Sequence, residues 1–243
     1  MISVLAAAGE PVIPDFGGSG TSCVRANGTF CVDWFRDNWS GIFVPALGQH
    51  VKLVVIAIVV GFALSAALAL VAHRFRWTEK PITVVTGILY TIPSLALFQL
   101  LVPITKLSLL TAEIALVSYT LLILFRNMLE GLRAVSADVR DAARGMGLTD
   151  RQVLWKVELP LALPAIIAGL RIATVTIISL ATVAAFVINE GLGKPIFDAI
   201  QSNAFKTEIF AAGGLAVAMA LFADGALVLL QRALTPWARA RTR

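Results

Sequence analysis

Long apolar runs alternate with shorter polar segments over most of the chain. Five of these runs approach or exceed the roughly 20 apolar residues that a helix needs to cross a bilayer. They cover approximately residues 50–72, 81–102, 109–125, 161–188 and 208–230. Runs of this length are typical of transmembrane helices. The pattern therefore predicts an all-α integral membrane protein with a five-span core.

Composition supports this fold class. Hydrophobic residues make up 58% of the chain and charged residues 14%, whereas soluble proteins usually contain about 25% charged residues. The mean hydropathy is +0.84, and a length of 243 residues leaves no room for a large soluble domain beside the spans. The formal net charge of +5 does not indicate nucleic-acid binding, because the basic residues lie in the loops between apolar runs. The lipid bilayer is the expected environment, and no nucleic-acid partner is expected.

The basic residues are distributed unevenly between the two sides of the spans. Thirteen of the 20 Lys and Arg residues fall in segments 74–80, 126–156 and 232–243, six fall on the opposite side, and Arg171 lies within a span. The side richer in Lys and Arg is normally cytoplasmic. We therefore expect the N-terminus outside the cell and the C-terminus in the cytoplasm.

This orientation divides the chain into three expected parts. Residues 1–49 form an extracytoplasmic tail, residues 50–231 a transmembrane domain, and residues 232–243 a basic cytoplasmic tail. Aromatic residues gather just before the first span, at Trp34, Phe35, Trp39 and Phe43. Aromatic side chains favour the membrane interface, so residues 33–47 are predicted to form an interfacial helix along the outer surface.

Cys23 and Cys31 are the only cysteines, and both lie in the extracytoplasmic tail. Thiols outside the cell membrane can be oxidised, so a disulfide is favoured over two free thiols. No metal site is expected, because a metal would need more ligands and no histidine lies near the cysteines. His50 and His73 fall at opposite ends of the first span, and we interpret both as solvated at the membrane interfaces.

Two charged residues fall within spans, Arg171 in the fourth and Asp224 in the fifth. An unpaired charge within a membrane is unfavourable, and such residues usually face the protein interior or pair with each other. One hypothesis is that Arg171 and Asp224 face the interior as an ion pair. The alternative is that each side chain reaches the inner interface independently.

The second and third spans also carry side chains that could line a water-filled path. They are Tyr90, Thr91, Pro93, Ser94, Gln99, Ser118 and Tyr119. Pro93 loosens the local helix, and the Thr, Ser and Gln side chains offer polar groups. The same side chains could instead hold neighbouring helices together. Path lining is favoured, because Pro and Gln together are unfavourable for simple packing.

A glycine-containing segment follows the fourth span on the side predicted to be outside. It includes Asn189, Glu190, Gly191 and Gly193, and its glycines permit tight backbone turns. An amphipathic stretch follows at about residues 196–205. We interpret the segment as an outer loop with a short surface helix that closes the exit or binds a partner. An ordinary connection is the alternative.

The polar segment 141–160 is longer than a simple connection between spans requires. It contains Asp141, Ala142 and Ala143, then Gly147, and it ends at Pro160. Small alanines allow another surface to approach a helix closely, Gly147 would end or bend that helix, and Pro160 would set the start of the next one. These features predict a cytoplasmic helix that binds in a partner's groove.

Chemistry of its own is not expected of this chain. The sequence has no Gly-rich loop followed by Lys-Ser or Lys-Thr, which a phosphate-binding loop for ATP requires. Gly145 and Gly147 do not form a dinucleotide-binding motif, because no third glycine and no preceding strand accompany them. No pairing of nucleophile and base is present, so no catalytic residue is assigned and an enzyme is not expected.

The segment from Asp141 to Pro160 resembles the coupling motif of binding-protein-dependent ABC importer permeases. That motif reads Glu-Ala-Ala, three residues, Gly, nine residues, Ile-x-Leu-Pro; here Asp141 replaces the Glu and Val157 the Ile, while every spacing is kept. Further stretches are similar to the osmoprotectant branch, which imports glycine betaine, choline, carnitine and proline. They are residues 90–97, 115–116, 126–127, 131–132, 157–164, 169–171 and 191–193.

The resemblance implies a larger machine in a bacterial cell membrane, the inner or plasma membrane. Its expected partners are a cytoplasmic ABC ATPase dimer, a second permease subunit, identical or related, and an extracytoplasmic solute-binding protein. ATP and Mg would be bound by the ATPase, and no cofactor by this chain. A coupling helix at about residues 138–151 would lie in a groove of the ATPase. The residues expected to contact the ATPase are Asp141, Ala142, Ala143, Arg144, Gly147 and Leu148.

Other functions remain open at the level of sequence. An importer permease for another small solute, such as methionine, would contain the same coupling helix. A channel or a membrane scaffold could use segment 141–160 only for assembly. Co-purification with an ATPase and solute-stimulated ATP hydrolysis would separate these classes.

Overall fold

The computed structural model describes residues 22–202 and 205–237. Helices are the only regular elements within these residues, as the predicted all-α fold class requires. The outermost parts of the two expected tails, residues 1–21 and 238–243, lie outside the described residues.

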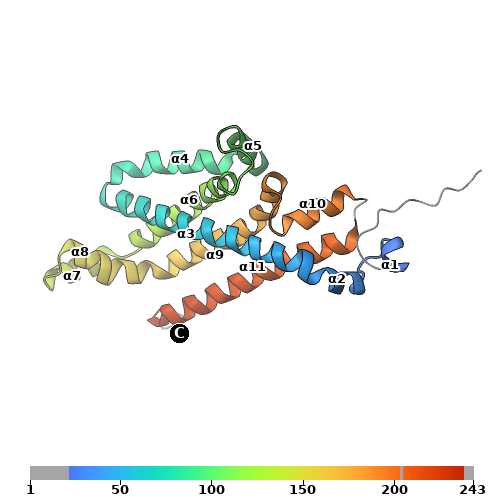
Figure 1. Cartoon of the computed structure of the whole chain (residues 1–243). Coiled ribbons are helices and arrows are strands. Elements are labelled where there is room, and N and C mark those ends of the chain that lie inside the picture. Colours follow the sequence, from blue (N-terminus) through green and yellow to red (C-terminus); the bar gives the residue numbers. More distant parts are fainter. Residues whose placement is uncertain (1–21, 203–204, 238–243) are drawn as a thin grey trace, which may run out of the picture.

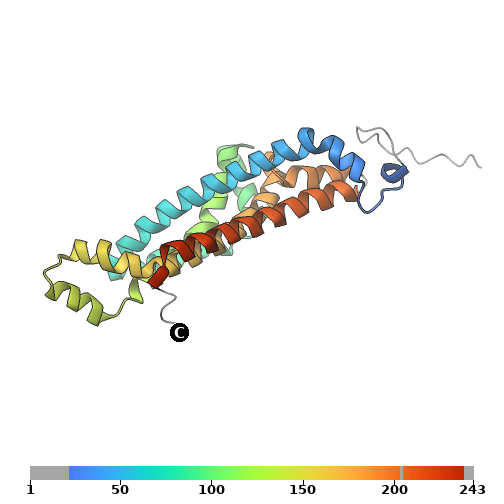
Figure 2. The same cartoon turned by 90° about the horizontal axis from the view of Figure 1, so that it is seen from below.

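Long apolar helices run side by side as an elongated bundle, as Figure 1 and Figure 2 show. Those long and apolar enough to cross a membrane are the helical stretches Val32–Arg74, Leu109–Arg133 (α6), Asp150–Ile188 and Lys206–Leu234 (α11). The first stretch comprises α2 (Val32–Asn38), the π-helical turn η1 (Trp39–Phe43) and α3 (Val44–Arg74). The third comprises α8 (Asp150–Val153), the π-helical turn η3 (Leu154–Glu158) and α9 (Leu159–Ile188).

Helix α6 lies at the centre of the packing. It contacts both α3 and α9, and α11 joins the bundle chiefly through α9. One apolar cluster includes Phe98, Leu116 and Ile177. A second includes Phe125 and Met128. The buried side chains of these two clusters come from α3, α5, α6 and α9, while α11 exposes most of its apolar surface.

Glycines set how closely these helices approach. A side-chain carbon at Gly61 of α3 would overlap Thr120 of α6, and one at Gly169 of α9 would overlap Asn127 of α6. Small residues at such contacts let helix backbones pack closely in membranes, where dispersion contacts replace hydrophobic driving force. The fixed spacing of α3, α6 and α9 follows from these two contacts.

The predicted second span is not one straight helix. It consists of α4 (Glu79–Thr91) and α5 (Ser94–Thr105), which meet at an angle of 98°. Ile92 has an extended backbone with ψ of 129°, because the ring of Pro93 disfavours helical geometry in the residue before it. The predicted second span over 81–102 therefore consists of two helices that meet at a break, and Pro93 breaks the helix rather than loosening it.

The N-terminal helical run also differs from the expected arrangement. We expected an interfacial helix over 33–47 separate from a span beginning at His50, but the helix continues through both without a sharp bend. Its 43 residues rise by about 64 Å at 1.5 Å each, roughly twice the thickness of the hydrocarbon core. The run must therefore tilt or extend beyond the bilayer. Its position relative to the outer membrane surface stays a prediction.

Short elements lie at the two ends of the bundle (Figure 1). Helix α7 (Ala137–Gly145) and α8 lie at one end, and α1 (Ser22–Arg25) and α2 at the other. Helix α10 (Gly193–Gln201) packs against α9 and α11 on the side of α1. A 3-10 turn, η2 (Arg76–Thr78), joins α3 to α4. The structure thus places the segment that resembles a coupling motif and the predicted outer loop at opposite ends.

Candidate coupling site and outer loop

The segment with the coupling motif forms a helical hairpin of α7 and α8, residues 137–153, which projects from the bundle (Figure 2). Ser136 caps the start of α7 by accepting a hydrogen bond from the Val139 amide at 3.4 Å. At the other end, the Gly147 amide donates to Arg144 C=O and the Leu148 amide to Ala143 C=O. This is a Schellman ending, in which the residue after the cap takes a left-handed backbone. Gly147, with φ of 85°, supplies it, and α7 ends two residues before it, which confirms that Gly147 ends this helix.

The helix that follows begins earlier than the sequence predicted. Thr149 and Gln152 form a capping box, with the Thr149 amide donating to Gln152 Oε1 at 2.8 Å. The continuous helical run therefore begins at Asp150, ten residues before Pro160. Pro160 lies in the first turn of α9, as predicted, but it does not start the run. A proline within a helix collides with the carbonyl four residues earlier. The wider π turn η3 ends at Glu158, two residues before Pro160, and such a turn relieves that crowding.

The expected coupling helix over 138–151 is consequently shorter. Helix α7 ends at Gly145, residues 146–149 form the turn, and Asp150 and Arg151 belong to α8. The residues expected to contact a partner also differ in accessibility. Asp141, Ala142, Arg144 and Gly147 are exposed, Leu148 is half-buried, and Ala143 is buried. Ala143 therefore packs within this chain instead of offering a free surface.

The sequence analysis missed two exposed apolar side chains near this hairpin. Met146 at its tip is 74% exposed, and Trp155 is 59% exposed. Large apolar side chains exposed on a polar segment often mark a protein contact. Met146 lies between Gly145 and Gly147, and that position in a polar turn was the available signal.

Arg144 joins the two helices of the hairpin. Its Nη1 donates to Asp141 Oδ1 and its Nε to Asp150 Oδ1, both at 3.2 Å. The hydrogen bond to Asp150 raises the pKa of the Arg144 guanidinium, with a further contribution from the nearby charge of Asp141. Both pairs are exposed, so they add little stability; the pair with Asp150 joins α7 to α8, whereas the pair with Asp141 lies within α7.

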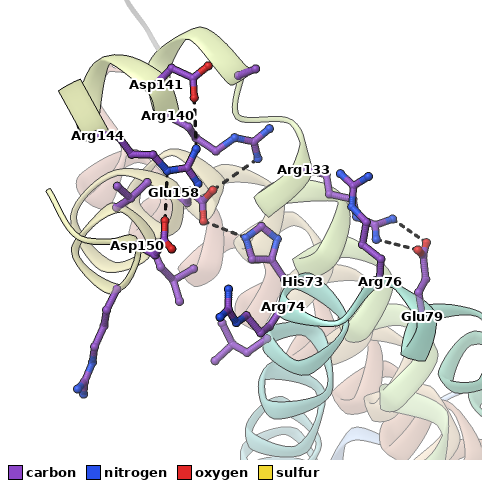
Figure 3. A pocket seen from close by; sticks show the side chains of 15 residues that line it. His73, Arg74, Arg76, Glu79, Arg133, Arg140, Asp141, Arg144, Asp150 and Glu158 are labelled. Atoms are coloured by element: carbon purple, nitrogen blue, oxygen red, sulfur yellow. Dashed lines mark hydrogen bonds and ion pairs between the residues drawn. The ribbon is translucent and has the colours of Figure 1, made fainter.

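A cavity of about 900 Å³ lies between the hairpin and the ends of α3, α4 and α6. Its charged lining residues are His73, Arg74, Arg76, Glu79, Arg133, Arg140, Asp141, Arg144, Asp150, Arg151 and Glu158 (Figure 3). Arg133 donates to both oxygens of Glu79, at 2.6 and 2.7 Å, and so joins α6 to α4. Glu158 accepts from His73 Nε2 at 3.0 Å and from Arg140 Nη1 at 3.5 Å.

Arg171 and Asp224 form an ion pair between α9 and α11. Arg171 Nε donates to Asp224 Oδ1 at 2.7 Å, and Nη2 donates to Oδ2 at 2.9 Å. This is the pairing that one of the two hypotheses expected. The side chains are 33% and 35% exposed, so the pair is half-buried between the two helices.

Several of the predicted path residues meet where the second span breaks. The rings of Tyr90 and Tyr119 lie 5.9 Å apart, edge to face, and the Tyr119 hydroxyl donates to Ile92 C=O. That bond satisfies a carbonyl that the broken helix leaves free, which a membrane interior requires. Thr91 and Ser118 instead donate to carbonyls of their own helices, at 2.8 and 2.7 Å.

The other predicted path residues lie on α5 and at its start. Pro93 and Ser94 begin that helix, and Gln99 is exposed on its surface. The structure thus gathers Tyr90, Tyr119 and the break itself at one place.

The outer loop, residues 189–193, is bonded to the start of α3. Asn189 and Gly191 take positive φ angles of 53° and 78°, and the Gly191 amide donates to Gln49 Oε1 at 3.0 Å. The Leu192 amide donates to His50 Nδ1 at 3.2 Å. Glu190 is half-buried, and a side chain at Gly193 would overlap Thr182 C=O, so α10 folds back closely onto α9.

His50 is fully buried, so its interpretation as a solvated interfacial residue was wrong. Its Nε2 lies 3.1 Å from Ile178 C=O. Because Nδ1 accepts from the Leu192 amide, the ring proton must reside on Nε2 and be donated to that carbonyl. Only the neutral Nε2–H tautomer satisfies both contacts.

The described part of the N-terminal tail packs on α10 and α11. Cys23 and Cys31 form a disulfide with a Cα–Cα distance of 5.8 Å. The Cys31 amide donates to Thr207 Oγ1 at 2.8 Å. The rings of Trp34 and Phe205 meet at 4.8 Å. The disulfide therefore closes a loop that is fastened to the start of α11.

No group of three or more His, Cys, Asp or Glu side chains within residues 22–202 and 205–237 is placed to hold a metal ion. The chemical capacity of the described residues lies instead in hydrogen bonding and ion pairing. The exposed hairpin offers a protein contact, and the broken span offers aromatic and hydroxyl groups within the bundle.

Comparison with known proteins identifies the family. The family model described as "Binding-protein-dependent transport system inner membrane component" matches residues 42–239. The choline transport system permease protein OpuBB of Bacillus subtilis (strain 168) is 33% identical over 189 residues, which cover 77% of this chain and 86% of that protein. The osmoprotectant import permease protein OsmW of Salmonella typhimurium (strain LT2) is 33% identical over 211 residues, covering 84% and 97%.

A solved structure shares the fold. The inward-facing MetNI methionine ABC transporter matches with a TM-score of 0.72 at 19% identity, over 82% of this chain and 99% of the matched one. These relatives are permease subunits and not enzymes; the ATPase of such a transporter is a separate subunit. With four long apolar helices and a bent pair within its described residues, the chain is a multi-pass membrane protein. It belongs to the family of binding-protein-dependent transport system inner membrane components, the permease subunits of ABC importers.

Proposed function

We propose that this chain forms the path of an ATP-driven importer for osmoprotectants such as choline, carnitine or glycine betaine, with proline as a related solute. Relatives named for transport of choline, carnitine and glycine betaine are 31–33% identical over most of the chain. The observation that supports coupling to an ATPase is the hairpin of α7 and α8. It projects from the bundle, is capped at both ends, and exposes Asp141, Arg144 and Met146.

The proposal assigns energy supply to partner subunits. A cytoplasmic ATPase dimer binds ATP and Mg, and this chain binds no cofactor. The ATPase surface receives α7, with Asp141, Ala142, Arg144, Gly147 and Met146 at the contact. Ala143 and Leu148 support that contact from within the hairpin. An extracytoplasmic binding protein delivers solute to the opposite end, near the outer loop.

The proposed path follows the broken span. Tyr90 and Tyr119 bring two aromatic rings together at the break between α4 and α5, and aromatic faces attract quaternary ammonium cations. A second permease subunit completes the path, and the exposed apolar surface of α11 contacts that subunit or lipid. The proposed topology places residues 1–49 and the N-terminus outside, the domain of 50–231 in the membrane, and the tail of 232–243 in the cytoplasm.

Uptake by the native complex tests this function. The complex would be purified through a tag on this chain and reconstituted into vesicles with ATP inside or outside. We expect ATP-dependent uptake of labelled choline, carnitine or glycine betaine in the presence of the binding protein. Unlabelled methionine serves as the competitor that should have no effect. Uptake of methionine alone would identify another importer, and flux without ATP would identify a channel.

Labelling tests the topology independently. The variant Arg144→Cys places a thiol on the exposed hairpin, and the native cysteines are joined to each other. A membrane-impermeant thiol reagent should label this variant in inside-out vesicles and leave it unlabelled in intact cells. Labelling in intact cells would place the hairpin outside and contradict the proposed coupling to ATPase.

A further inference from the structure

One buried carboxylate joins three elements at the hairpin end of the bundle (Figure 3). The Glu158 side chain is 6% exposed and lies at the end of η3, directly before α9. Its Oε2 accepts from His73 Nε2 at the end of α3 at 3.0 Å, and its Oε1 accepts from Arg140 Nη1 in α7 at 3.5 Å. Glu158 therefore connects the coupling hairpin to α3 as well as to its own helix.

The burial of this group makes the connection specific. A buried carboxylate is unfavourable unless charged or polar groups satisfy it, and removing one partner of such a cluster is more disruptive than losing an exposed pair. The pairs of Arg144 lie within the hairpin and at its surface, so they cannot connect it to α3. Arg140 faces the cavity of about 900 Å³, which leaves space for the hairpin to move.

Helix α3 extends from this cluster to the outer loop. His73 and His50 lie on the same continuous helix, separated by about 35 Å at a rise of 1.5 Å per residue. His50 Nδ1 accepts a hydrogen bond from the Leu192 amide, and His50 Nε2 donates to Ile178 C=O. Each end of α3 is thus hydrogen-bonded through a histidine, one to the Glu158 cluster and the other to the outer loop.

We propose that Glu158 is a positioning residue that transmits displacement of the coupling hairpin to α3 and, through α3, to the outer loop. The inference rests on the proposed ATP-driven function. In this arrangement Arg140 moves with α7, Glu158 follows it, and His73 carries the displacement into α3. A rigid element held at both ends in two alternative arrangements is a physical basis for coupling distant sites.

The test uses the native complex in vesicles and measures solute uptake and ATP hydrolysis in the same sample. The first variant is Glu158→Gln, which keeps the size of the side chain and removes its charge. The second is His73→Leu, which detaches α3 while Glu158 keeps Arg140. We expect both to retain the ATPase subunit and its hydrolysis. Solute imported per ATP should fall at least about fivefold, the lower end of measured couplings between sites.

Matched variants separate positioning from a merely structural role. His73→Gln keeps an N–H donor for Glu158 and should restore most of the uptake per ATP. Glu130→Gln removes an exposed carboxylate from α6 at the hairpin end of the bundle. This variant should leave uptake per ATP unchanged. The double variant Arg140→Gln/Glu158→Gln should lower uptake per ATP no further than Glu158→Gln alone, because both changes break the same linkage.

Three outcomes would overturn the inference. Uptake per ATP could be unchanged in His73→Leu, or equally low in His73→Leu and His73→Gln. Assembly and hydrolysis could also be lost together with uptake in His73→Leu, which would make the cluster a folding contact only. If Glu158→Gln does not assemble, His73→Leu and His73→Gln decide the question. A wild-type complex without ATP-driven uptake would instead refute the proposed function, independently of these variants.

Discussion

Replacing His50 should release the outer loop from α3, by an amount that the structure allows us to estimate. His50 and Leu192 are both fully buried, and the Leu192 amide has His50 Nδ1 as its acceptor. In His50→Leu this amide loses its partner, whereas Ile178 C=O remains within α9. An orphaned buried donor costs about 1–3 kcal/mol in the free energy of unfolding. Leucine is close to histidine in size, so the variant creates little additional cavity.

The expected change is large enough to measure. In a chain of this size, 1 kcal/mol corresponds to a shift of about 2–4 °C in Tm, so His50→Leu should lower the Tm by about 2–12 °C. Thermal unfolding of the purified chain in detergent would give this shift. Hydrogen exchange at the Leu192 amide reports the same contact directly, and it should be slow in the wild type and fast in the variant.

Two conservative variants test the cause. The Oδ1 atom of His50→Asn lies near the position of Nδ1, so it can accept from the Leu192 amide and should restore slow exchange. The amide of His50→Gln lies near the position of Nε2, so it can reach Ile178 C=O but should leave exchange fast. A Tm of His50→Leu within about 1 °C of the wild type, which is half of the smallest expected shift, would refute the reasoning. So would equal protection in the Asn and Gln variants.

The remaining predictions concern the hairpin, the ion pair and the disulfide. At Gly147 a side chain would meet nothing within 4 Å, so Gly147→Val should destabilise the chain only through the left-handed backbone, by about 1–2 kcal/mol. Gly147→Val should reduce ATPase co-purification more than Gly147→Asn does. Equal effects of the two variants would argue against the Schellman ending. Arg171→Gln and Asp224→Asn should each reduce the yield of folded protein in membranes, and the double variant should lose less than the sum, because each single change leaves one charge without its partner; additive losses would contradict the pair. Replacing Cys23 and Cys31 by Ser should lower the free energy of unfolding by about 2–3 kcal/mol through the lost cross-link. A reducing agent should lower the Tm of the wild type to that of the Ser variant and leave the Tm of the Ser variant unchanged.

The candidate coupling site was the part of the molecule most open to prediction from sequence. The interactions that shape this site are local. Gly147 ends α7 through its own backbone conformation, and the Schellman hydrogen bonds join residues only a few positions apart. The same local information was insufficient at Pro160 and Pro93. A proline can begin a helix, lie within it beside a π turn, or break it by 98°. Which of these occurs depends on contacts such as the one that Tyr119 makes with Ile92 C=O.

The buried histidine and carboxylate were beyond sequence reasoning. His50 binds Leu192 and Ile178, which lie 142 and 128 residues away in the chain, so its neighbours give no sign of its burial. Glu158 likewise binds His73 at a separation of 85 residues. The sequence did show that Glu158 is a carboxylate directly before an apolar span. It gave no local indication of which residues donate hydrogen bonds to that carboxylate.

The sequence by itself determined that this protein spans a membrane with helices and carries a polar segment with the coupling spacing. These properties depend on composition and on residues close in the chain, where apolar length and backbone preference act directly. Only the tertiary structure decided which polar groups meet: Glu158 with His73 and Arg140, His50 with the outer loop, and Arg171 with Asp224. Such pairs are set by how α3, α6, α7, α9 and α11 pack. That packing depends on shape complementarity among distant segments, which no local pattern records.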